Sequence, residues 1–220
     1  DRGSGLDYAL AWEVRSDTFS PRARWVSWID AHTGELLAVQ DELLRTERAV
    51  YATHDLRTID GDMVTSPMPY LPVWSDDGSA GYTDDQGVVN LDGGSFSSEL
   101  QGEHFRVYNS SGAEGELFFT GDQGTWTADD ADQSEIDSYV FLHHVLEWAE
   151  EFSPGHPISR YQLESYVNVR DAVCNAWFDG NLNFGPEDSG YGCNSTARIA
   201  DVNYHEWGHG FHYWGLESGT

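Results

Sequence analysis

The chain has 220 residues, enough for one large domain or two to three small ones. Its hydrophobic content of 39% and its nine tryptophans can support buried cores, which excludes a disordered chain. The net charge of -27 comes from 38 acidic residues against 11 basic ones, all of them Arg, and so acidic a surface repels nucleic acid and anionic lipid as partners.

Residues 8–43 predict β-strands joined by a tight turn. Two apolar runs, at 24–29 and 36–40, are separated by a short polar stretch that contains Gly34. A Gly-containing turn between two apolar runs is typical of a β-hairpin. We therefore expect a hairpin in this part of the chain.

Residues 48–120 also predict strands, with closer turns. Clusters of Asp, Gly and Ser recur along this stretch, and Val, Tyr, Phe and Trp lie between them. This pattern favours a small antiparallel β-sandwich, which we place at 48–125.

From residue 126 onward the pattern changes, and helices are expected. Apolar positions at helical spacing run from Ile136 to Ala149, Asp132 or Ser134 offers an N-cap, and Pro154 ends the helix. After it we expect a strand at 166–169, a loop-rich stretch at 179–196 and a final helix from about Thr196 to His212. The whole chain is thus predicted to be α+β.

No stretch of 18 apolar residues occurs, so we expect no membrane span.

The most informative segment is His205-Glu206-Trp207-Gly208-His209. On a helix, residues four apart lie on one face, so both imidazoles can contact one zinc ion. Glu206 lies near that face and can take a proton from a zinc-bound water. We predict zinc ligands at His205 and His209 and a general base at Glu206, which together would hydrolyse a peptide bond.

The residues around this motif resemble a known family. Residues 198–212 resemble the active-site helix of thermolysin-like and fungalysin-like metallopeptidases, and 174–180, Cys-Asn-Ala-Trp-Phe-Asp-Gly, resemble their substrate-binding edge strand. The resemblance extends over about 133–215. It implies substrate backbone contacts at Asn175 and Ala176, and a peptide or protein as substrate.

The earlier segments resemble the same families more weakly. Residues 25–37, with Asp-Ala-His-Thr-Gly between two strands, resemble the end of the propeptide that precedes such peptidases. The resemblance implies a propeptide-like remnant at 1–47, the sandwich at 48–125, and at 126–220 an incomplete, N-terminal lobe of the catalytic domain.

The third zinc ligand is not evident in this sequence. In thermolysin-like enzymes it is a Glu on the next helix, but 11 residues follow His209, and Glu217 lies at too short an offset. The astacin-like pattern requires Gly and then His, whereas His212 and Gly215 stand in the reverse order. We expect a second polypeptide, produced by cleavage or by continuation beyond Thr220, to complete the zinc site and its oxyanion-binding groups.

Two cysteines, Cys174 and Cys193, lie 19 residues apart in a stretch rich in Gly, Pro, Asn and Asp. We expect a disulfide, which would contribute on the order of 3 kcal/mol. A disulfide implies an oxidising compartment, so the protein is expected to be secreted. The alternative is a pair of buried reduced thiols.

Other polar clusters carry weaker signals. Asp-rich turns at 76–77, 84–85 and 129–132 offer the oxygen ligands that Ca²⁺ prefers, but ordinary turn chemistry is the preferred interpretation. The pair His143-His144 lies in the first helix, where a structural role is favoured over contact with the cleft.

Three functional hypotheses follow. The leading one is a secreted zinc endopeptidase that retains its propeptide remnant. The second is a non-catalytic extracellular protein that keeps a peptidase-like domain as an interaction surface. The third is a zymogen inhibited by residues 1–48.

Overall fold

The structure is a computed structural model that describes residues 9–19, 22–41, 46–171 and 173–217. It divides into two compact units, Asp1–Thr46 and Glu47–Thr220. Helices and several sheets give the α+β composition that the sequence predicts. Predictions that concern Tyr8, Thr220 or the side chain of Glu217 lie outside the described residues.

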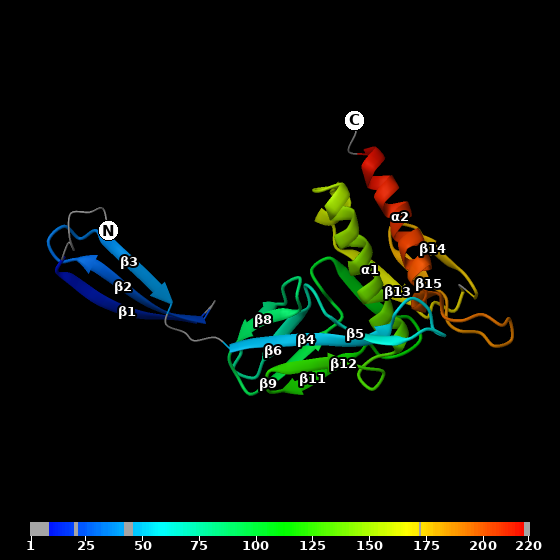
Figure 1. Cartoon of the computed structure of the whole chain (residues 1–220), viewed down its shortest axis with the longest axis horizontal. Helices are drawn as coiled ribbons and strands as arrows, with labels where there is room; N and C mark the ends of the chain where they lie inside the picture. Colours follow the sequence, from blue (N-terminus) through cyan, green and yellow to red (C-terminus); the bar gives the residue numbers. More distant parts are fainter. Residues whose placement is uncertain (1–8, 20–21, 42–45, 172, 218–220) are drawn as a thin grey trace. The chain divides into compact units, whose positions relative to one another are not determined.

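The first unit contains a three-stranded antiparallel sheet in the order β1-β2-β3 (Figure 1). Its strands are β1 (Ala11–Phe19), β2 (Arg22–Asp30) and β3 (Leu36–Asp41). The carboxylate of Asp30 accepts backbone N–H hydrogen bonds from His32 and Thr33, both at 2.8 Å. Gly34 completes the turn with φ of 75°, a conformation that favours glycine. The hairpin predicted around Gly34 is confirmed.

The second unit begins with two sheets packed on one core. One sheet has the order β12-β4-β5, with β8 also paired to β4, and the other has the order β11-β9-β6-β7. Buried residues alternate along most of these strands, and Val50, Phe96 and Trp126 belong to the shared hydrophobic core. The strands are β4 (Thr46–Asp55), β5 (Met63–Pro67), β6 (Pro72–Ser75), β7 (Ala80–Tyr82), β8 (Val88–Leu91), β9 (Ser95–Glu99), β11 (Glu116–Thr120) and β12 (Gln123–Trp126).

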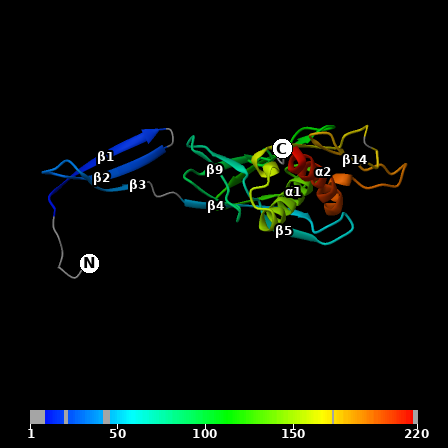
Figure 2. The same ribbon diagram turned by 90° about the horizontal axis from the view of Figure 1, so that it is seen from above.

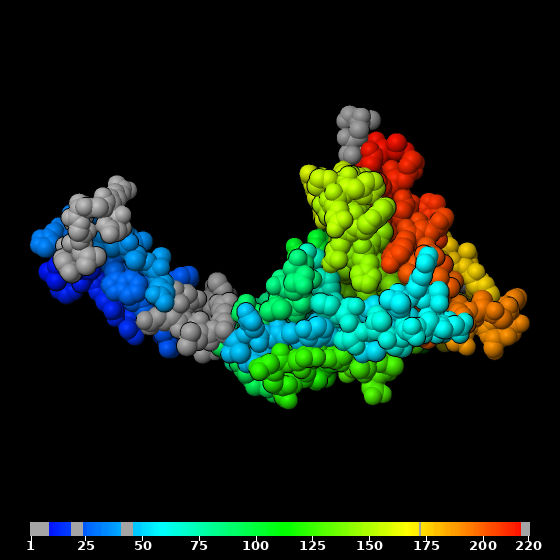
Figure 3. Space-filling model, viewed as in Figure 1, coloured from blue at the N-terminus to red at the C-terminus, as the bar shows by residue number. Residues whose placement is uncertain are grey.

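A third sheet, in the order β10-β13-β15-β14, lies against the helices. Its strands are β10 (Phe105–Asn109), β13 (Leu163–Val167), β14 (Ala176–Phe178) and β15 (Leu182–Phe184). The helices are α1 (Gln133–Phe152), η1 (Pro157–Arg160), η2 (Thr196–Arg198) and α2 (Ala200–Glu217). Helix α1 packs on β10 and β13, and α2 packs on α1 and β14 (Figures 1 and 2). The space-filling view shows the surfaces of α1 (yellow-green) and α2 (red) next to each other (Figure 3).

The prediction of a purely antiparallel sandwich at 48–125 is wrong in two respects. Strand β12 pairs with β4 in parallel, and β10 belongs to the third sheet. The reason for the second difference is burial, because Phe105 and Val107 of β10 lie in the core beside α1. Residues 48–125 and 126–220 therefore share one core and one compact unit.

Helix α1 begins with a capping box. Asp132 is the N-cap residue, and its carboxylate accepts the backbone N–H of Ser134 at 2.9 Å. The Glu135 side chain accepts the backbone N–H of Asp132 at 3.1 Å, so two donors that the first turn cannot satisfy are bonded. Of the two predicted caps, Asp132 is the one used.

Neither described helix is long and apolar enough to cross a membrane.

A buried charge cluster joins three elements of the second unit. Arg198, at the end of η2, pairs with Asp55 of β4 through Nη2 at 2.7 Å and with Asp137 of α1 through Nε at 3.2 Å. Both carboxylate side chains are almost fully buried, and the backbone N–H of Asp55 donates to Asp137 at 3.0 Å. Burial, followed by the hydrogen bond with the neighbouring Asp55 carboxyl, raises the pKa of Asp137 to about 7.

This pKa predicts a loss of stability as the pH rises. The folded pKa of Asp137 lies above the unfolded value of 3.8, so the folded state binds more protons between these values. The contribution of Asp137 is fully present below the lower value and is lost as the pH approaches about 7. We expect the stability advantage of the wild type over Asp137→Asn to shrink between pH 5 and pH 8, as measured by urea unfolding. A pH-independent difference would contradict the raised pKa.

Candidate functional site

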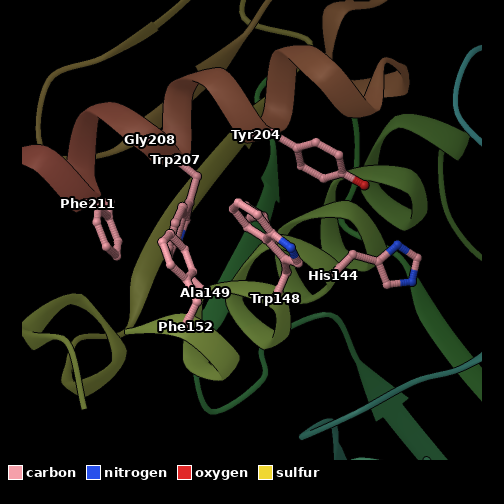
Figure 4. A pocket seen from close by; sticks show the side chains of 9 residues that line it. His144, Trp148, Ala149, Phe152, Tyr204, Trp207, Gly208 and Phe211 are labelled. Atoms are coloured by element: carbon pink, nitrogen blue, oxygen red, sulfur yellow. The ribbon is translucent and has the colours of Figure 1, made fainter. Parts of the chain in front are cut away.

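Helix α2 presents different residues on two faces. Tyr204, Trp207 and Phe211 extend towards α1, from which Trp148 extends in return (Figure 4). These positions follow helical spacing, and Trp207 is only 3% exposed. His205 and His209 lie on the other face and are exposed. The apolar face thus fixes the helix against α1 and leaves the histidines accessible.

The ring nitrogens of the two histidines lie close together. The Nε2 atoms of His205 and His209 are 3.1 Å apart, close enough for one to donate a hydrogen bond to the other. Their rings are nearly perpendicular, at 89°, with centroids 4.7 Å apart. The four-residue spacing on a helix is the local cause of this approach.

Glu206 and both histidines line the same cleft, with a volume of about 750 Å³. Glu206 is 6% exposed, far less than the histidines beside it. Asn175 and the residues of strand β14 line the same cleft. The structure therefore brings the predicted residues 175, 176, 205, 206 and 209 together around one cleft.

Strand β14 is at the end of its sheet, with β15 on one side. The carbonyl of Asn175, just before it, accepts hydrogen bonds from the backbone N–H of Gly185 at 3.0 Å and from the Thr196 hydroxyl at 3.1 Å. Since Thr196 begins η2, which leads into α2, these bonds connect the two walls of the cleft.

The predicted disulfide between Cys174 and Cys193 is confirmed. Cys174 immediately precedes Asn175, and Cys193 lies three residues before Thr196. The bridge therefore links the same two segments as the Thr196 hydrogen bond. Residues 187–192 between them are mostly exposed, so they contribute little core that could hold the loop.

Several cleft residues were not identified from the sequence. Trp177, Phe178, Tyr213 and Leu216 line the cleft, and so does His212, which the sequence does not assign to the site. For Tyr213 and Leu216, helical spacing from His209 and His212 was an available signal, because positions three and four apart share a face. Trp177 and Phe178 were part of the edge-strand motif but were not assigned a role.

Other candidates have different surroundings. His143 is buried beside Tyr139 and Phe105 and does not line the cleft, and neither does His144. The Asp84 carboxylate accepts backbone N–H bonds within its own turn, and so does the Asp130 carboxylate. Asp76 accepts such a bond from Gly94, which lowers the pKa of Asp76.

Within the described ranges, no group of three or more His, Cys, Asp or Glu side chains is placed to hold one metal ion. His205 and His209 thus form a two-residue donor pair.

Comparison with protein-family models finds no match for this chain, and comparison with curated proteins finds none either. The functional interpretation therefore depends on the site itself.

The two glycines next to the histidines predict opposite effects of alanine. A Cβ at Gly208 would meet no atom within 4 Å, whereas one at Gly210 would lie 3.0 Å from Trp214 and 3.2 Å from Ile158. We expect Gly208→Ala to stabilise the protein by up to about 1 kcal/mol through helix propensity. Gly210→Ala should destabilise it by about 1–3 kcal/mol through overpacking. Thermal unfolding of the two variants tests this, and equal shifts would be inconsistent with the packing described.

Proposed function

We propose that this chain carries part of the active site of a secreted, zinc-dependent endopeptidase of the thermolysin/fungalysin kind. The observation that carries the proposal is the 3.1 Å separation of the His205 and His209 Nε2 atoms. Two nitrogens bound to one tetrahedral zinc at about 2.0–2.1 Å lie roughly 3.3 Å apart. The separation of the two nitrogens is therefore close to the one that a shared zinc ion requires.

The chemistry follows from which atoms face the cleft. His205 and His209 would hold the metal with their Nε2 lone pairs, in their neutral forms. A zinc ion bound there supplies Lewis-acid activation of a water molecule and of the scissile carbonyl. Glu206 would accept the proton of the attacking water and pass it to the leaving amine. Its low exposure keeps bulk water away from this carboxylate.

The edge strand β14 suits an extended peptide. A strand at the end of a sheet offers backbone N–H and C=O groups to which a substrate can pair as an added strand. Asn175 and Ala176 lie beside the histidines in the same cleft, so a peptide paired there would pass close to Glu206. This supports peptide bonds, rather than another class of ester or amide, as the substrate.

Catalytic zinc sites use three protein ligands and one open position. His205 and His209 supply two, and we propose that a further polypeptide supplies the third, together with the groups that stabilise the oxyanion. The side of α2 that lines the cleft is exposed, since Tyr213 is 50% and Leu216 64% exposed. This surface leaves room for that polypeptide.

The metal assignment can be tested by zinc analysis. His205→Ala should abolish zinc binding, because one donor cannot hold the ion. His212→Ala is the matched control, since His212 lines the same cleft but lies seven residues from His205, roughly 10 Å along the helix. We expect it to retain zinc. Zinc content unchanged by His205→Ala would rule the site out.

The role of Glu206 requires a separate measurement. Glu206→Gln should retain zinc while the kcat for a peptide substrate falls at least about 100-fold, since only the proton acceptor is lost. Retained zinc with no peptide hydrolysis in the wild-type protein, measured with its completing polypeptide, would favour the non-catalytic alternative.

The substrate edge predicts an effect on KM. Asn175→Ala removes an amide that lines the cleft but leaves the Asn175 carbonyl bonds to Gly185 and Thr196 intact. We expect KM for a peptide substrate to rise roughly tenfold with a smaller change in kcat. Asn194→Ala, at an exposed position in the same loop region, should leave both constants unchanged. Equal effects of the two variants would contradict this role.

A further inference from the structure

Two segments of the chain match the Asn-x-Ser/Thr pattern of N-glycosylation acceptors. They are Asn109-Ser110-Ser111 and Asn194-Ser195-Thr196. So short a pattern is weak evidence by itself. The structure places the two asparagines in opposite surroundings, however, and this difference separates one candidate acceptor from the other.

Asn109, the last residue of β10, is held by hydrogen bonds at both ends of its amide. Its Nδ2 donates to the Glu135 carboxylate at 3.1 Å, and its Oδ1 accepts the backbone N–H of Ser111 at 3.2 Å. Oδ1 also accepts a hydrogen bond from the Asn168 amide at 3.3 Å. The chain passes so close that a Cβ built at Gly112 would lie 3.1 Å from Nδ2. A sugar on this nitrogen would displace these neighbours.

The Glu135 carboxylate cannot give up these contacts without a loss of stability. It is 1% exposed, and it completes the capping box of α1 by accepting the backbone N–H of Asp132 at 3.1 Å. It also accepts the backbone N–H of Gly115 at 3.1 Å. Unpaired polar groups in a buried site destabilise a folded protein. Chains modified at Asn109 would therefore be depleted from the folded protein.

Asn194 has the opposite surroundings. It is exposed, directly after Cys193 of the disulfide and just before η2. Among the described residues, its side chain forms no hydrogen bond or ion pair, and it does not line the histidine cleft. Tyr191 of the same loop is 78% exposed. A glycan on Asn194 would therefore extend into solvent without breaking a contact of the described chain.

The hydroxyl group of the same acceptor pattern is not accessible. Thr196 is 8% exposed, and its hydroxyl is hydrogen-bonded to the Asn175 carbonyl at 3.1 Å and to the backbone N–H of Gly185 at 2.8 Å. The acceptor pattern requires a Ser or Thr, so the transferase recognises this hydroxyl group. It cannot reach the hydroxyl of Thr196 once these bonds have formed.

We propose that Asn194, and not Asn109, carries an N-linked glycan that is attached before the segment around Thr196 folds. The donor is a sugar activated by a lipid phosphate. The Asn194 Nδ2 forms a bond to the anomeric carbon of the sugar, and the bond from that carbon to the phosphate oxygen breaks. The lipid phosphate leaves with the proton that Nδ2 loses.

This modification goes beyond the proposed peptidase function. It rests on the secreted localisation proposed above, which the disulfide supports because such bonds form in oxidising compartments. It requires neither zinc nor peptide hydrolysis. The presence of the glycan can therefore be tested whether or not the metal site is correct.

The test is expression of the chain with a secretion signal in a eukaryotic host, followed by peptide mapping. Peptide-N-glycosidase in heavy-oxygen water converts each glycosylated asparagine to a labelled aspartate. We expect the label at Asn194 and not at Asn109. Asn194→Gln should lose the glycan and keep the fold, because this side chain is exposed and makes no contact that the fold requires.

Ser111→Ala is the matched control. It removes the acceptor pattern of Asn109 but leaves the Ser111 backbone N–H that donates to Asn109 Oδ1. We expect this variant to carry the same glycan at Asn194 as the wild type does.

The order of folding and modification has its own measurement. Chain that is made without glycosylation, with its disulfide formed, is offered to a purified oligosaccharyltransferase and a lipid-linked sugar. The folded chain should not be modified, because the Thr196 hydroxyl is buried. The same chain, reduced and unfolded, should be modified at Asn194.

Three results would overturn the proposal. One is an unlabelled Asn194 in the secreted wild-type protein. Another is a label at Asn109 equal to that at Asn194, since the surroundings of the two side chains would then have no effect. The third is modification of the folded chain as rapidly as of the unfolded one. None of these readouts depends on zinc content or peptidase activity.

Discussion

The position of the candidate site depends on Arg198. This side chain lies between Asp55 of β4 and Asp137 of α1, two carboxylates that are almost fully buried. Removing one partner from a buried ion pair typically costs about 3–5 kcal/mol, because the remaining charge is left without solvent or a counterion. Arg198 is also the last residue of η2, and Ile199 alone separates it from α2. The same interaction that satisfies the buried charges therefore fixes where the histidine helix begins.

A second set of links holds the edge strand relative to that helix. The disulfide Cys174–Cys193 and the Thr196 hydrogen bond to the Asn175 carbonyl both connect the start of β14 to the segment before α2. Residues 187–192 are mostly exposed, so covalent and polar links replace the apolar packing that positions α1. The two walls of the cleft are thus positioned by different kinds of interaction. One depends on a buried core and a charge cluster, and the other on a cross-linked loop.

Local features of this fold could be predicted from the sequence, and long-range ones could not. The Asp132 cap, the Gly34 turn and the helical phase of residues 204–211 depend on neighbours in the chain. The parallel pairing of β12 with β4 does not, because alternation of apolar residues is the same in parallel and antiparallel strands. Strand β10 was assigned to the sandwich for the same reason. Its partner, β13, lies more than 50 residues later, and only burial beside α1 selects it.

The candidate site shows the same division. The approach of His205 to His209 follows from their four-residue spacing, so the sequence predicts it. The burial of Glu206 depends instead on the packing of α2 on β14. So does the contribution of Trp177 and Phe178 to the cleft wall. Gly210 explains how close that packing is, since Ile158 of η1 and Phe178 of β14 both lie within contact distance of its missing Cβ. A helix that carries donor side chains on one face must be held rigidly on the other, and a glycine at the point of closest contact lets α2 approach the sheet. The absence of a Cβ at Gly210, rather than its low helix propensity, is therefore the condition for placing His205 and His209 beside the edge strand.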